Sequence, residues 1–210
     1  MSKPIKIEYF TDVLCVWAWV SQQRIERLEK LFGEQISFQF RYLDVFGDTQ
    51  QKMQNQWAER GHYQGFAEHV KNSASCEPNA IINPKIWQEV QPTTSTTAHL
   101  ILKAIELAYH ADKSSEMALV FRKAFYIDAL DISQLSILMQ LVSEHGLETT
   151  LVQKFVENGQ AIAALMTDYQ YANQQSLKGS PTFIIDNSRQ VLFGNVSDKV
   201  LQANISAHIS

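Results

Sequence analysis

The sequence is short of cysteine, of positive charge and of long hydrophobic runs, and each shortage excludes a class of protein. Two cysteines in 210 residues are too few for the disulfide framework of a small secreted domain. The formal net charge is −4, and no cluster of Lys and Arg offers a footprint for nucleic-acid phosphates. No apolar run approaches the roughly 20 residues of a membrane-spanning helix. We therefore expect neither a nucleic-acid partner nor a membrane span.

Signals for metals, phosphates and export are also missing. The six histidines show no metal-ligand spacing, so we expect no metal site. There is no Gly-rich phosphate loop and no serine-nucleophile elbow. The first four residues lead directly into a β-prone run without a signal-peptide pattern, which predicts a cytoplasmic, reducing location.

The most informative stretch is residues 5–19, where a β-prone run changes to helical spacing. Thr11 and Asp12 form the polar break between the two patterns, so Cys15 is expected near the first turn of a helix. Free N–H groups and the helix dipole at that place can lower the pKa of a thiol from about 8.5 to roughly 3.5–7.5. This position alone leaves two interpretations of Cys15 open, a nucleophile or a buried structural thiol, because free cysteine is among the most buried residue types.

A redox site at such a position normally carries two cysteines as C-x-x-C. Here the segment is C-V-W-A, with Val16 and Trp17 in the middle and Ala18 in place of the second thiol. No neighbouring thiol can then compete for a mixed disulfide on Cys15, so its release requires an external thiol.

The neighbours of Cys15 have more than one interpretation. Asp12 either caps the following helix or accepts a proton, and capping is the commoner role. Of Trp17 and Trp19, we expect one in the core and the other as a wall beside the thiol. Cys76 could resolve a disulfide on Cys15 only if their Cα atoms lie within about 7 Å, and we favour an unpaired loop cysteine.

The order of patterns along the chain is β-α-β, a long helical block, then α-β-β-α. This order predicts an α/β fold in which residues 1–45 and 161–210 share one sheet and residues 46–160 form a helical insertion. Expected helix boundaries are Thr94 or Ser95 to residue 111, and Ser133 to Gly146. A hairpin turn is expected at Asp186-Asn187-Ser188.

Four motifs, in order, resemble those of the DsbA-like branch of the thioredoxin superfamily, and the resemblance covers nearly the whole chain. It is closest to the FrnE-like and 2-hydroxychromene-2-carboxylate isomerase-like members. The motifs are YFTDVLCVWAW at residues 9–19, similar to D-x-x-C-P-W-C-Y; STTAH at 95–99, similar to N-T-x-x-A-H; FRKAFY at 121–126 with DIS at 131–133, similar to A-Y-F … D-I-S; and GSPTFII at 179–185, similar to G-V-P-T-F.

The resemblance implies a thioredoxin-like fold interrupted by a large all-helical insertion. It favours Cys15 as the catalytic nucleophile over a buried structural thiol. It also implies that Pro181 follows a cis peptide bond, which would bring the backbone of Ser180 beside Cys15. Ser180, Pro181 and Thr182 would then bind a thiol substrate as an added strand. His99, in the second motif, is expected to be a capping or core hydrogen-bond partner rather than a base.

Val16 and Ala18 depart from the family pattern, and three hypotheses about function follow. We favour a monothiol thiol-disulfide oxidoreductase whose mixed disulfide is released by glutathione or another external thiol. The second hypothesis is a glutathione-dependent transferase or isomerase of the kappa-class or 2-hydroxychromene-2-carboxylate isomerase type, with aromatic residues of the 49–92 segment lining an apolar pocket. The third is a non-catalytic binding protein. No tightly bound cofactor is expected, glutathione is a candidate co-substrate, the substrate is a small or peptide thiol or disulfide, and assembly as a homodimer stays open.

Overall fold

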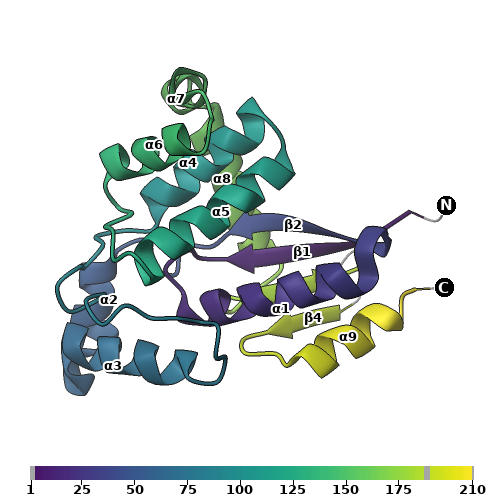
Figure 1. The fold of residues 1–210 in the computed structure, drawn as a ribbon, viewed down its shortest axis with the longest axis horizontal. Coiled ribbons are helices and arrows are strands. Elements are labelled where there is room, and N and C mark those ends of the chain that lie inside the picture. The colour runs from purple at the N-terminus through teal and green to yellow at the C-terminus, as the bar shows by residue number, and fades with distance from the viewer. Residues whose placement is uncertain (1–2, 187–189, 210) are drawn as a thin grey trace.

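The computed structural model describes residues 3–186 and 190–209. Within this part of the chain, four strands form one mixed sheet in the order β2-β1-β3-β4 (Figure 1). Strands β1 (Ile5–Thr11) and β2 (Ile36–Tyr42) are parallel, whereas β3 (Thr182–Ile185) is antiparallel to both β1 and β4 (Gln190–Phe193). The predicted thioredoxin-like order is confirmed. The expected turn at 186–188 lies largely outside the described residues.

The central strand β1 is covered on both faces, which explains its nearly continuous burial. On one face lies α1 (Val16–Phe32), with α9 (Asp198–Ser206) beside it (Figure 1). On this face the ring of Tyr9 contacts Phe40 and Phe183. On the other face Phe10 packs in a second, smaller core with Ala172 of α8 (Gln160–Gln174). Both faces of the sheet therefore help to fix the end of β1.

A block of helices separates β2 from β3, as the sequence predicted. Its central helix is α4 (Thr96–Ala108), which packs against α5 (Ala111–Tyr126), α7 (Thr149–Glu157) and α8 (Gln160–Gln174). Ser95 is the N-cap residue of α4, as expected. The N-cap residue of α6 (Leu135–Glu144) is Gln134 rather than the expected Ser133, whose hydroxyl donates to Asp131. The helices are α2 (Thr49–Gln56), α3 (His62–Ala74), α4 (Thr96–Ala108), α5 (Ala111–Tyr126), α6 (Leu135–Glu144), α7 (Thr149–Glu157) and α8 (Gln160–Gln174), with short 3-10 turns at Gly33–Gln35 and Ala58–Arg60.

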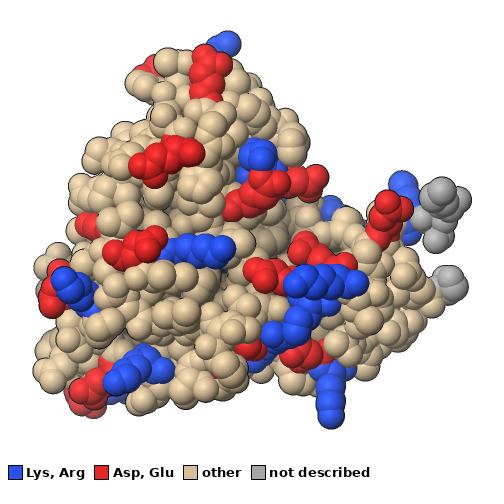
Figure 2. All heavy atoms as spheres, in the orientation of Figure 1, with Lys and Arg blue, Asp and Glu red and all other residues tan. Residues whose placement is uncertain are grey.

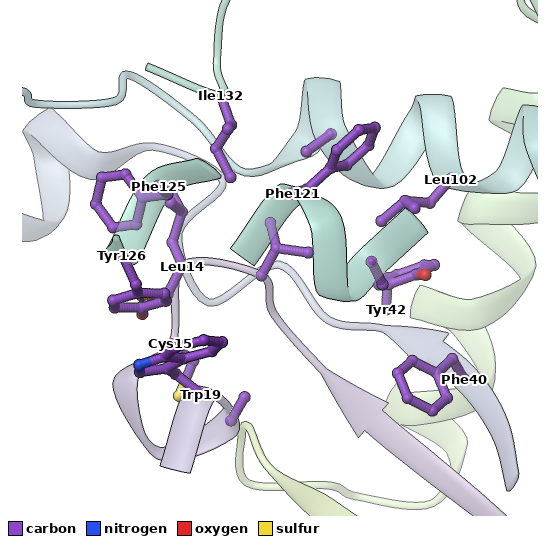
Figure 3. Close-up of a cluster of buried hydrophobic side chains, with 14 of the residues drawn as sticks. Leu14, Cys15, Trp19, Phe40, Tyr42, Leu102, Phe121, Phe125, Tyr126 and Ile132 are labelled. Atoms are coloured by element: carbon purple, nitrogen blue, oxygen red, sulfur yellow. Dashed lines mark hydrogen bonds between the residues drawn. The ribbon is translucent and has the colours of Figure 1, made fainter. Parts of the chain in front are cut away.

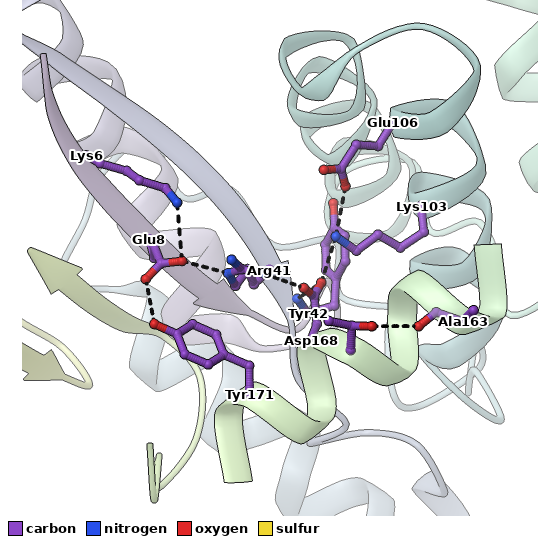
Figure 4. Close-up of polar contacts among 10 residues, drawn as sticks. Lys6, Glu8, Arg41, Tyr42, Lys103, Glu106, Ala163, Asp168 and Tyr171 are labelled. Atoms are coloured by element: carbon purple, nitrogen blue, oxygen red, sulfur yellow. Dashed lines mark hydrogen bonds and ion pairs between the residues drawn. The ribbon is translucent and has the colours of Figure 1, made fainter. Parts of the chain in front are cut away.

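A buried ionic network joins the sheet to the helical block (Figure 4). Asp168 of α8, which is 1% exposed, accepts from Arg41 of β2 at 2.9 Å and from Lys103 of α4 at 2.8 Å. Arg41 also contacts Glu8 of β1 at 2.8 Å. Because buried charges are stable only when they are paired and hydrogen bonded, this network holds α4 and α8 in a fixed position against the strands.

No described helix is both long and apolar enough to cross a membrane. On the face drawn in Figure 2, acidic and basic side chains are interspersed, and no large area carries a single sign.

Candidate functional site

Cys15 lies in the segment that connects β1 to α1, and it is the N-cap residue of α1. Its Sγ donates to the backbone oxygen of Ser180 at 3.2 Å. The peptide bond between Ser180 and Pro181 is cis. The fold thus brings the first and the last of the four motifs together, and it places the Cys15 thiol against the loop that precedes β3.

The turn that leads to Cys15 is held by side chains from distant elements. Each backbone N–H from residue 12 to residue 15 has an acceptor, as buried backbone groups require. The bonds are Asp12 N to Ser180 Oγ at 2.9 Å, Val13 N to His99 Nε2 at 3.2 Å, Leu14 N to Asp12 Oδ1 at 2.9 Å and Cys15 N to Asp12 O at 3.1 Å. In addition, the Tyr126 hydroxyl donates to Leu14 O at 2.7 Å.

The Asp12 carboxylate connects three elements rather than capping the helix. Besides Leu14 N, it accepts from Phe46 N at 2.9 Å and from the Ser95 hydroxyl at 2.8 Å. Burial raises the pKa of Asp12 to about 6, although its hydrogen bonds oppose that shift. The prediction of a helix cap is wrong, because the N-cap residue is Cys15 and no side chain caps α1.

His99 is a buried, neutral hydrogen-bond acceptor. Because Nε2 accepts the Val13 N–H, the ring proton is assigned to Nδ1, which has no partner among the residues that the structure describes. Burial, together with the positive charges of Arg122 and Lys103, lowers the pKa of His99 to about 3. The ring stacks on Tyr42 with centroids 4.7 Å apart. These contacts agree with a core hydrogen-bond partner and not with a general base.

The environment of the thiol differs from the expectation. Cys15 is only 6% exposed, and burial raises its pKa because a thiolate loses its hydration there. The Ser180 hydroxyl and the amides of Ala18 and Trp17 act in the opposite direction, whereas the charge of Asp12 raises the pKa further. The predicted lowering of the Cys15 pKa is therefore wrong. At neutral pH the thiol keeps its proton.

The two tryptophans have different positions, as the sequence suggested. Trp19 is 1% exposed, stacks on Tyr126 at 5.3 Å and donates from Nε1 to Ile81 O (Figure 3). Trp17 is half-buried and packs against the core. Trp19 thus belongs to the core, and Trp17 is the member of the pair that borders solvent.

Three of the remaining predicted site residues, Val16, Ala18 and Thr182, are buried. Val16 is 4% and Ala18 is 0% exposed, so the position of the missing second thiol is closed to solvent. Thr182 belongs to β3, where it pairs with Phe10. Both cysteines are free: Cys76 is exposed and Cys15 is buried. The two cysteines are therefore not bonded to each other in this structure.

Sequence reasoning missed Lys52, a half-buried residue of α2. Its Nζ lies 4.8 Å from the centre of the Phe46 ring and 3.0 Å from Gln56 Oε1. The negative charges of Asp12 and of an ionised Cys15 both favour its protonated form, although burial lowers its pKa. A lysine in a Gln-rich helix gives no sequence signal of a functional site. Only the tertiary structure reveals that the charges of Asp12 and Cys15 act on Lys52.

Comparisons with solved structures agree with this fold. The 2-hydroxychromene-2-carboxylate isomerase structure superposes with a TM-score of 0.65 at 13% identity, over 96% of this chain and 95% of that one. The cytosolic disulfide reductase DsbM from Pseudomonas aeruginosa superposes with a TM-score of 0.74 at 15% identity, over 97% and 98% of the two chains.

Among curated sequences, the ClpXP adapter protein SpxH from Halalkalibacterium halodurans is 24% identical over 190 residues, or 88% of this chain. The chain spans only 60% of the length of that relative. The model of the DSBA-like thioredoxin domain family matches residues 6–206, nearly the whole chain. The chain therefore belongs to the DSBA-like thioredoxin domain family.

Proposed function

We propose that this protein is a monothiol thiol-disulfide oxidoreductase that uses Cys15 and an external thiol. The observation that carries the proposal is the 3.2 Å contact between Cys15 Sγ and the backbone oxygen of Ser180, at the start of α1. Membership of a family of DSBA-like domains and the likeness to a disulfide reductase support it. The proposed external thiol is glutathione.

The reaction is an exchange of sulfur–sulfur bonds. The Cys15 thiolate attacks one sulfur of a substrate disulfide R–S–S–R′, a Cys15–S–S–R bond forms, and R′–S⁻ leaves and takes up a proton. The thiolate of the external thiol then attacks the sulfur of R. This second step releases R–S–S–R″ and restores the Cys15 thiolate, so one disulfide is consumed and one is formed. Ala18 cannot replace the external thiol in this step.

The surroundings of Cys15 predict a slow enzyme at neutral pH. Because the raised pKa leaves little thiolate at pH 7, the rate should increase as the pH rises. The amides of Trp17 and Ala18 at the start of α1 would stabilise the thiolate once it forms. The backbone of Ser180 would align the substrate as an added strand.

The test is turnover of a glutathione mixed disulfide of a small thiol, with glutathione as the reductant. We expect Cys76→Ser to keep wild-type activity, Cys15→Ser to lose it, and the rate to rise with pH beyond about 8.5. Activity that survives in Cys15→Ser would overturn the proposal. We further propose a cytoplasmic location, which the likeness to cytosolic DsbM supports.

A non-catalytic binding function is the second candidate. Two observations favour it: Cys15 is only 6% exposed, and the matching relative SpxH is named as an adapter protein. The same assay separates the two candidates, since a binding protein would show no turnover that depends on Cys15. The transferase or isomerase hypothesis has less support, because Phe66 and Trp87 of the 49–92 segment are 4% and 0% exposed and pack against each other in the core.

A further inference from the structure

A groove borders the loop that contacts Cys15. Its volume is about 540 Å³, and its walls come from the segment after β2, from α2, from α8 and from the segment before β3. Gly179 lines the groove and directly precedes Ser180, whose backbone oxygen accepts from Cys15 Sγ. A molecule bound in this groove would therefore lie next to the loop that contacts the sulfur atom of the proposed function.

The charged residues in the groove are two lysines and one carboxylate. Lys52 and Lys178 supply the positive charges, and Asp44 supplies the negative one. The net charge of the lining is therefore positive, although the net charge of the whole chain is −4.

Lys52 is the half-buried cation of the groove, and its Nζ contacts uncharged groups. Its Nζ has a neutral hydrogen-bond partner, Gln56 Oε1 at 3.0 Å, and lies over the ring of Phe46. None of the ion pairs formed among the described residues includes Lys52. A half-buried ammonium group without an anion loses solvation that an anionic ligand would offset. Lys52 also lines a second groove of about 350 Å³.

We propose that the substrate of Cys15 is an acidic thiol or disulfide whose carboxylate binds to Lys52 in this groove. This inference rests on the proposed function and specifies its substrate class. The carboxylate would pair with Lys52, and Lys178 would add to the attraction from the same groove. Lys52 would then determine specificity for acidic substrates, because it binds the substrate carboxylate and takes no part in the exchange of sulfur–sulfur bonds.

The test compares two alkylating reagents that deliver the same reactive carbon to Cys15. Iodoacetate carries a carboxylate and iodoacetamide is neutral, so the ratio of their rate constants cancels the fraction of Cys15 that is ionised. All variants carry Cys76→Ser, so that Cys15 is the only cysteine. We expect Lys52→Gln to lower the iodoacetate-to-iodoacetamide ratio about fivefold at low salt, a change equivalent to about 1 kcal/mol of charge–charge attraction.

Two control variants isolate the position of the charge. Lys52→Arg keeps the charge and should keep the ratio. Lys154→Gln removes the same charge from an exposed position on α7 and should leave the ratio unchanged. High salt should reduce the wild-type ratio towards that of Lys52→Gln.

Each outcome decides between the two proposals. A ratio that does not change in Lys52→Gln, or that falls equally in Lys154→Gln, overturns the acidic-substrate inference and leaves the exchange chemistry of Cys15 standing. A Cys15 that reacts with neither reagent in the folded protein overturns both proposals.

Discussion

Replacing His99 by glutamine should remove a loss of stability at mildly acidic pH. His99 is fully buried, and its Nε2 accepts the N–H of Val13, in the turn before Cys15. A protonated Nε2 could not accept that bond, and Arg122 and Lys103 would repel the new charge. Folding therefore holds the pKa of His99 at about 3, compared with 6.5 for an ordinary histidine.

The sign and size of the effect follow from proton linkage. Below pH 6.5 the unfolded chain binds a proton at His99 that the folded protein excludes until about pH 3. The stability contributed by neutral His99 is thus fully present above pH 6.5 and is lost as the pH falls towards 3. Each pH unit in this window costs about 1.4 kcal/mol, which gives about 2 kcal/mol by pH 5.

Asp12, whose carboxylate lies 3.8 Å from His99 Nε2, acts in the opposite direction. Its pKa is raised from 3.8 to about 6, so it contributes stability that is fully present below pH 3.8 and is lost as the pH rises through 6. The stability of the wild type as a function of pH would therefore not show the contribution of His99 separately, because the contribution of Asp12 partly cancels it. A comparison of wild type with His99→Gln, both of which contain Asp12, isolates the contribution of His99.

The assay is urea unfolding followed by tryptophan fluorescence at pH 8 and at pH 5. Between these values, the wild type should lose about 2 kcal/mol more stability than His99→Gln. The exposed His145→Gln is the matched control and should behave as the wild type. Equal losses in wild type and His99→Gln would refute the assignment of His99 as a buried neutral acceptor.

Urea unfolding also tests three other contacts. Asp168→Asn should cost about 3–5 kcal/mol, because it removes the buried anion that Arg41 and Lys103 share. Glu106→Gln, which alters only the outer partner of Lys103, should cost about 1 kcal/mol or less, and equal losses in the two variants would contradict the network. Tyr126→Phe and Ser180→Ala should each cost about 1–3 kcal/mol, because each leaves a buried backbone group of the Cys15 turn unpaired. Variants as stable as wild type would show that these bonds do not hold the turn.

The sequence predicted those parts of the site that depend on local pattern. The change from β to helical spacing around Cys15 correctly indicated the start of α1. That signal lies within a few residues of the feature that it indicates, so neighbouring residues suffice to recognise it. The position of Ser180 beside Cys15 was instead implied by the family resemblance, and the contact between Ser180 and Cys15 agrees with this expectation.

The properties that depend on tertiary packing could not be predicted in this way. The direction of the Cys15 pKa shift depends on burial, which packing from distant parts of the chain produces. The hydroxyl of Ser95 turns from its own helix to Asp12, and that bond exists only because the helical block packs on the end of β1. Lys52 was missed for the same reason.

The most direct test of the account is whether Cys15 of the folded protein forms a mixed disulfide. The Cys76→Ser variant would be mixed with glutathione disulfide over a range of pH and its intact mass followed with time. We predict one glutathionyl adduct on Cys15, formed faster as the pH rises and removed by excess glutathione. An unmodified native protein at every pH, alongside a urea-unfolded sample that gains the adduct, would contradict exchange chemistry at Cys15.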